Sequence, residues 1–288
     1  MALHKPPPGI RARQPGAPLV AGDMIKRIGG GALVGLLILG GVLYGDWLWD
    51  VIASLIALGS LWELYQLLIS KYRLSRGWGL TGGVLMLVTV SMGYSFALVL
   101  SILPLVAFLV LFTEVVRRES LGQSYAIWNV GGTLSGLIYI VLPWSFLILI
   151  RSQTSGLMLL LTLFLCTWSC DIAAFVAGSL FGQSPLCDRV SPKKSWEGFL
   201  AGVAASSLCG ASVAYFFDFA PIPLLLLGLL CGIAGQIGDL CESVLKREAK
   251  VKDSGKVIPG HGGFLDRFDS ILINATLAFF IIEVIGWS

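Results

Sequence analysis

The chain has 288 residues, of which 56% are hydrophobic and only 13% are charged, whereas soluble domains have about 25% charged residues. This composition excludes an ordinary soluble protein and predicts an integral membrane protein. The formal net charge of +3 is less informative than the distribution of the charges along the chain.

The predicted elements are a tail followed by a series of apolar spans. Residues 1–22 contain five of the twelve prolines and no apolar periodicity, which predicts a disordered cytoplasmic tail. Apolar segments long enough to cross a bilayer as helices follow, and we expect nine spans: 28–45, 47–69, 79–95, 97–114, 125–147, 156–178, 198–217, 221–240 and 268–287. An eight-span alternative stays open because the separations at Asp46 and near Tyr94 are short. The expected fold is an all-α, polytopic helical bundle.

The basic residues predict the orientation of these spans. With the N-terminus in the cytoplasm, nine spans leave 19 of the 20 lysines and arginines inside and only Arg151 outside, as the positive-inside rule requires. The C-terminus is then expected outside. The six cysteines form no CxxC pair, so we expect reduced thiols in the core and no zinc framework.

The two halves of the chain differ in character. Residues 23–150 are predicted to form a transmembrane scaffold, and residues 151–288 a catalytic transmembrane region. Polar residues gather in the second half at 166–183, at 191–199 and from 235 to 270. All three places lie at the predicted cytoplasmic ends of spans, so segments distant in sequence can form one site on that face.

Carboxylates in and beside the spans are the first candidate site residues. Asp171 falls inside an apolar span, where a carboxylate costs about 2.5–3.5 kcal/mol, so it needs either a neighbouring helix, a metal or a substrate as partner. Asp239 and Glu242 are three residues apart and share one helical face. Alone, such a pair often only ends a membrane segment.

The segment that follows predicts a site for a metal-bound polyphosphate. A basic cluster from Lys246 to Lys256 precedes a glycine-rich stretch, whose backbone N–H groups can approach an anion closely. Asp266 and Asp269, three residues apart, can face one hard cation, and Mg²⁺ is the usual choice for such oxygen ligands. Zinc is disfavoured because His4 and His261 supply one plausible ligand. For His261 we favour a hydrogen-bonding or loop-shaping role.

These residues carry a family resemblance. The run SVLKREAKVKDSGKVIPGHGGFLDRFD, residues 243–269, resembles the signature of phosphatidate cytidylyltransferases, and the similarity extends through GDLCES and SPKKSWEG back to Asp171. The resemblance implies that CTP and phosphatidic acid react to give CDP-diacylglycerol and pyrophosphate with Mg²⁺. It also implies membrane lipids and a homodimer as partners, no nucleic acid, and a bacterial-type inner membrane with the active site facing the cytoplasm.

The resemblance also implies roles for individual residues. The expected metal ligands are Asp239, Asp266 and Asp269, and the expected catalytic residues are these three with Lys246 and Lys252. The expected substrate-binding residues are Asp171, Ser191, Lys193, Lys194, Ser195, Arg247, His261, Gly262, Gly263 and Arg267. Ser191 and Ser195 can either bind the nucleotide or cap the following helix.

Two other functions stay open from the sequence. One is a CTP-dependent polyprenol or phytol kinase, which would transfer the γ-phosphate to a lipid alcohol. The other is a transporter in which Asp171 and Glu63 line a polar path. The transporter leaves the motif of residues 243–269 without a role.

Overall fold

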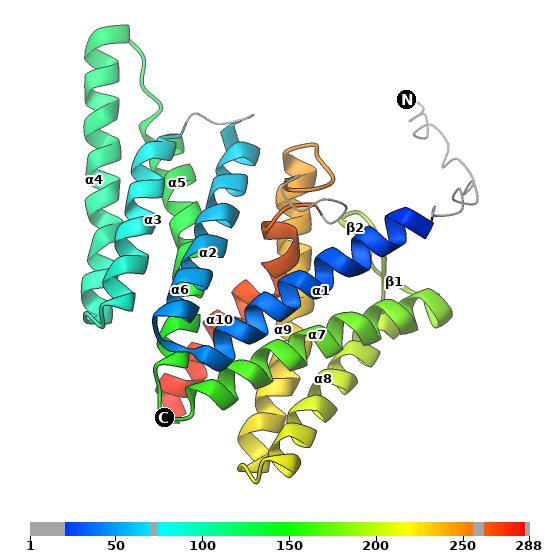
Figure 1. The fold of residues 1–288 in the computed structure, drawn as a ribbon. Coiled ribbons are helices and arrows are strands. Elements are labelled where there is room, and N and C mark those ends of the chain that lie inside the picture. Colours follow the sequence, from blue (N-terminus) through cyan, green and yellow to red (C-terminus); the bar gives the residue numbers. More distant parts are fainter. Residues whose placement is uncertain (1–20, 70–73, 256–261, 286–288) are drawn as a thin grey trace, which may run out of the picture.

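Long helices make up most of the part of the chain that the structure describes, residues 21–69, 74–255 and 262–285 of a computed structural model (Figure 1). In chain order the elements are α1 (Ala21–Tyr44), α2 (Asp46–Ile69), α3 (Arg76–Ser91), α4 (Phe96–Leu121), α5 (Ala126–Gly136), η1 (Leu137–Val141), α6 (Leu142–Arg151), α7 (Gly156–Phe181), β1 (Pro185–Cys187), β2 (Ser191–Ser195), α8 (Trp196–Phe216), α9 (Pro221–Glu248) and α10 (Leu265–Ile285).

A helix coincides with each of the nine expected spans, the fifth being the continuous helix Ala126–Arg151. Among the described residues, six helices are long and apolar enough to cross a membrane: Asp46–Ile69, Phe96–Leu121, Ala126–Arg151, Gly156–Phe181, Trp196–Phe216 and Pro221–Glu248. The protein is therefore a helical, multi-pass membrane protein. The count of nine spans and the sides of the two termini stay predictions, as does the tail, of which residues 1–20 lie outside the described residues.

The helix Ala126–Arg151 contains a π-helical turn, η1. Pro143 follows that turn. Its ring nitrogen has no hydrogen to donate to the carbonyl of Tyr139, so the regular α-helical ladder cannot continue unchanged at this point. The helix resumes as α6 and brings Trp144 into the core.

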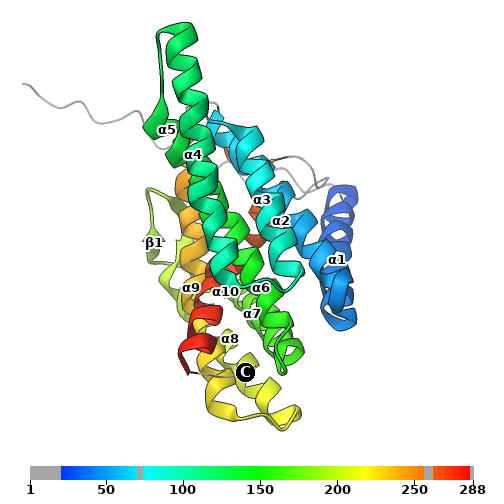
Figure 2. The ribbon, with the colours of Figure 1, turned by 90° about the vertical axis from the view of Figure 1, so that its left-hand side faces the viewer.

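An aromatic cluster joins the first half of the chain to the last helix. The ring of Trp49 in α2 lies 6.5 Å from that of Trp144 in α6 and 6.1 Å from that of Phe164 in α7, measured between centroids. Trp144 in turn meets Phe268 of α10 edge to face at 5.2 Å. All four rings are almost fully buried, so the first turn of α10 is fixed against α2 and α6 (Figures 1 and 2).

Close helix contacts through glycines hold α7, α8 and α9 together. A Cβ added to Gly198 of α8 would lie 2.7 Å from the carbonyl oxygen of Ala174 in α7, and one on Gly232 of α9 would lie 2.8 Å from the Cα of Val203 in α8. Small residues at helix crossings let membrane helices approach backbone to backbone. This packing fixes the ends of α7 and α9 relative to each other.

A short antiparallel hairpin of β1 and β2 connects α7 to α8, with Pro185 paired to Ser195 and Cys187 to Ser191. The sequence predicted a loop here and an all-α fold, because the segment has no alternation of apolar and polar residues typical of a strand. One backbone hydrogen bond continues the pairing beyond the strands: the N–H of Trp196 donates to the carbonyl of Ser184 at 2.9 Å.

Candidate active site

The three polar segments expected to form one site meet between the second halves of α7 and α9 and the start of α10. The Nζ of Lys194 in β2 lies 2.8 Å from Oδ2 of Asp239 in α9, and the Nζ of Lys246 in α9 lies 2.8 Å from Oδ1 of Asp266 in α10. The side chain of Arg247 joins α9 to the hairpin by donating to the carbonyl of Val190 at 3.2 Å.

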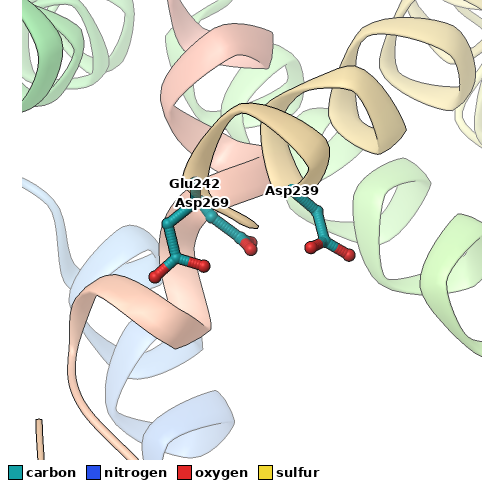
Figure 3. A group of neighbouring side chains, drawn as sticks. All are labelled: Asp239, Glu242 and Asp269. Atoms are coloured by element: carbon teal, nitrogen blue, oxygen red, sulfur yellow. The ribbon is translucent and has the colours of Figure 1, made fainter. Parts of the chain in front are cut away.

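Three carboxylates form a compact group at the centre of this site. Asp239 and Glu242 of α9 and Asp269 of α10 each place a ligand oxygen within 4.8 Å of the others, and Figure 3 shows their side chains pointing to the same side. Gly238 permits this meeting, because a Cβ there would lie 2.8 Å from the carbonyl oxygen of Asp269. The helices therefore approach closely where the acidic side chains converge.

The carboxylate group fits a hard divalent cation. Glu242 is fully buried, Lys246 forms an ion pair with its Oε2, and its Oε1 has no hydrogen-bond partner among the described residues. A buried, unpaired carboxylate oxygen is costly, and a cation held by all three side chains would satisfy it. Carboxylate oxygens are the usual protein ligands of Mg²⁺, so Asp239, Glu242 and Asp269 are the candidate ligands.

Asp266 has a different environment from these three residues. Its Oδ1 accepts from Lys246 and its Oδ2 accepts at 2.9 Å each from the N–H and hydroxyl of Ser254 and from the N–H of Gly263. Gly262 has a φ of +85°, a conformation suited to glycine. The carboxylate thus fixes the ends of the α9–α10 loop and the ammonium of Lys246, and it lies outside the three-carboxylate group.

Comparison with known proteins identifies the family. The model of the cytidylyltransferase family matches residues 25–285. The chain belongs to this family. Its relatives include a protein named phosphatidate cytidylyltransferase from Synechocystis, which is 44% identical over 46% of this chain and 45% of the relative. Another of the same name, from Rickettsia bellii, is 37% identical over 51% of this chain and 68% of the relative. A third, from Staphylococcus aureus strain COL, is 32% identical over 77% of this chain and 85% of the relative. The predicted family resemblance is confirmed.

Strand β2 contributes one of its two lysines to the site. Lys194 faces α9, where it also donates to the carbonyl of Gln236 at 3.1 Å, whereas Lys193 is exposed. Ser195 caps α8, because its hydroxyl accepts from the N–H of Gly198 at 3.2 Å. The structure thus supports the capping interpretation of Ser195, while Ser191 is partly buried.

Of the other predicted site residues, some lie in the part of the chain that the structure describes. Asp171, in the second half of α7, has Asp239, Lys194 and Arg267 as its charged neighbours. Lys252 is exposed beyond the end of α9. His261 lies outside the described residues. The roles proposed for these side chains stay predictions.

Two residues of the site did not enter the predicted set. Glu242 is one, although its spacing from Asp239 and from Lys246 four residues later places all three on one helical face. The other is Glu63 of α2, which contacts the start of α10. Its partners lie about 200 residues away in sequence, so no local pattern could identify them.

Proposed function

We propose that the protein is a phosphatidate cytidylyltransferase, which transfers CMP from CTP to phosphatidic acid and releases pyrophosphate. The single observation that carries the proposal is the group of Asp239, Glu242 and Asp269, with Lys194 and Lys246 beside it, at the ends of membrane helices. Such a site lies where a dissolved nucleotide can reach a lipid headgroup. Family membership and the names of the relatives support this function.

The proposed chemistry is an in-line displacement at the α-phosphorus of CTP. An oxygen of the phosphatidate phosphate forms the new P–O bond, and the bond between the α-phosphorus and the bridging oxygen of pyrophosphate breaks. The attacking phosphate is already ionised, so no general base is needed. Correct alignment and compensation of charge therefore provide most of the acceleration.

Named residues supply that alignment and charge. When bound, Mg²⁺ neutralises charge on the phosphate oxygens as a Lewis acid, and Asp239, Glu242 and Asp269 would hold it. Lys194 offers an ammonium at the open side of the group, where it can bind phosphate oxygens. Lys246, held between Glu242 and Asp266, reduces the mutual repulsion of the carboxylates.

The membrane arrangement is part of the proposal. We place nine spans in a bacterial-type inner membrane, with the N-terminus and the active site in the cytoplasm and the C-terminus outside. The segregation of 19 of the 20 basic residues to one side supports this orientation. The homodimer expected from the resemblance, and the division into a scaffold of 23–150 and a catalytic region of 151–288, stay predictions.

One incubation series tests the function. Detergent-purified protein is mixed with phosphatidate, Mg²⁺ and each nucleoside triphosphate in turn, and lipid and soluble products are resolved. We expect CDP-diacylglycerol and equimolar pyrophosphate with CTP. In a parallel series with polyprenol or phytol, a phosphorylated lipid with CDP would instead identify the kinase. Absence of CDP-lipid at every condition would refute the proposed function.

A further inference from the structure

A buried glutamate of the scaffold, Glu63 in α2, contacts the start of α10. Only 3% of the residue is exposed. Its carboxylate accepts hydrogen bonds from the N–H groups of Phe264 at 3.0 Å and Leu265 at 2.9 Å, and the hydroxyl of Ser254 lies 3.2 Å away. The first N–H groups of a helix have no partner within the helix, and a carboxylate there also interacts favourably with the helix dipole.

The same contacts lead directly into the active site. The hydroxyl of Ser254 lies between Oε2 of Glu63 and Oδ2 of Asp266, at 3.2 and 2.9 Å. Asp266 holds Lys246, and Lys246 forms an ion pair with Glu242 of the carboxylate group. A continuous series of polar contacts therefore runs from α2 to the candidate metal ligands.

Glycines allow α2 and the ends of the α9–α10 loop to pack closely against each other. Gly59 lies one turn before Glu63, and a Cβ on it would lie 2.9 Å from the ring of Phe264. Gly255 and Gly263 lie so close to the carboxylate of Glu63 that a Cβ on either would overlap it. Glycines on both sides of the contact thus allow the loop ends to lie directly against α2.

We propose that Glu63 is a positioning residue for cytidylyl transfer, although it does not touch the reacting atoms. By fixing the first turn of α10 and Ser254, it holds Asp266 against Lys246, and it holds Asp269 opposite Glu242 and Asp239. The catalytic part of this inference rests on the proposed function. The hydrogen bonds themselves can be tested without any assumption about the reaction.

Glu114 provides a matched control. It is also a buried glutamate of the scaffold, 2% exposed, and it also binds the start of a helix, accepting from the N–H of Tyr125 at 2.7 Å and from Asn129 at 2.6 Å. These contacts lie at the start of α5, away from the carboxylate group. Glu114 differs in that it also forms an ion pair with Arg117. Glu63→Gln and Glu114→Gln therefore make the same chemical change at two buried contacts with a helix start, of which one adjoins the site.

Hydrogen exchange of backbone amides tests the contact in the purified protein without substrate or metal. In Glu63→Gln the amides of Phe264 and Leu265 should exchange faster than in the wild type, and that of Tyr125 should not. In Glu114→Gln the amide of Tyr125 should exchange faster than in the wild type, and those of Phe264 and Leu265 should not. Unchanged protection of Phe264 and Leu265 in Glu63→Gln would overturn the proposal, whether or not the wild type makes CDP-diacylglycerol.

Kinetics test the consequence for the reaction. Loss of an outer contact that orients ligands typically lowers activity by about 10- to 100-fold, so we expect kcat of Glu63→Gln to fall in this range. The KM for CTP should change by less than about threefold, because the residue does not bind substrate. Glu114→Gln should retain kcat within about threefold, as expected for a change remote from the site.

Equal losses of kcat in the two variants, or none in Glu63→Gln, would show a merely structural role and overturn the proposal. If Glu63→Gln does not accumulate in membranes, Ser254→Ala replaces it. That change removes the link between Glu63 and Asp266 but leaves the contacts of Glu63 with the amides of Phe264 and Leu265. A lowered kcat with an unchanged KM for CTP supports the proposal, and wild-type kcat contradicts it.

Discussion

The residues on either side of Asp269 determine its position. The preceding residue, Phe268, is packed against Trp144 in the aromatic core, and the N–H of the following residue, Ser270, donates to Oδ1 of Asp269 at 2.6 Å. On the facing helix Gly238 leaves room for the backbone of α10. The acidic side chain is therefore oriented by a buried ring, a local hydrogen bond and a missing Cβ.

Removing one negative charge from the group should nearly abolish synthesis. Asp269→Asn and Asp239→Asn keep the size of the side chain but weaken a hard-cation ligand, and we expect kcat to fall by at least about 100-fold, as for loss of one transition-state stabilising group. The rate of CDP-diacylglycerol formation by equal amounts of purified protein measures this loss.

Asp218→Asn is the matched control for these variants. Asp218 is an exposed carboxylate between α8 and α9 with a φ of +53°, which asparagine also adopts readily, so turnover should be unchanged. Normal turnover of purified Asp239→Asn or Asp269→Asn would remove the metal assignment from that residue.

At the scale of single elements, strand β2 separates two neighbouring lysines. Alternate residues of a strand point to opposite faces, so Lys194 reaches Asp239 while Lys193 faces away. From the sequence alone both lysines had the same expected role, because no strand was predicted there. A pair of equivalent substitutions can therefore separate the two.

Lys194→Ala should lower kcat/KM for CTP by about tenfold or more, since a hydrogen bond to a charged group contributes about 1.5–3 kcal/mol. Lys193→Ala should change it by less than about threefold, because an exposed charge interacts weakly with the site. Steady-state kinetics at varied CTP concentration measure both. Equal effects of the two substitutions would contradict the assignment of Lys194 to the site.

The helices could be predicted because each depends on a long local run of apolar residues, whereas the count of nine spans stays a prediction. The site could be predicted in part, because its residues cluster in one motif whose family is recognisable. The sequence did not reveal the contact of Glu63 with α10, because its partners lie about 200 residues away. It did not reveal the hairpin between α7 and α8 either, because the segment has no alternation of apolar and polar residues. The spacing of Glu242 from Asp239 was evident in the sequence. Only its proximity to Asp269 in the structure distinguishes it from a carboxylate that merely marks the end of a membrane segment.

At the scale of the whole molecule, the connections between helices fall at two ends. The hairpin and the α9–α10 loop lie at the end that carries the carboxylate group, whereas the α6–α7 and α8–α9 connections lie at the other end (Figure 1). In a membrane these two ends would face different compartments. The proposed site therefore requires both of its loops on one side.

Cysteine labelling in intact cells tests this arrangement. We expect single added cysteines at the exposed positions Asp188 and Asp253 to be protected from a membrane-impermeant maleimide, and those at the exposed positions Thr154 and Asp218 to react. After the cells are opened, all four should react. If one of Asp188→Cys and Asp253→Cys reacts in intact cells and the other does not, the hairpin and the α9–α10 loop lie on opposite sides of the membrane, and the proposed site is refuted.

The position of α10 in the chain order also bears on how the enzyme is made. Among the described elements it leaves the ribosome last, after α9 with Asp239, Glu242 and Lys246. Until it inserts, those groups lack Asp269 and Asp266, and α2 lacks the amides that cover Glu63. The acidic group is therefore incomplete in a nascent chain, and the proposed site can form only after α10 has inserted.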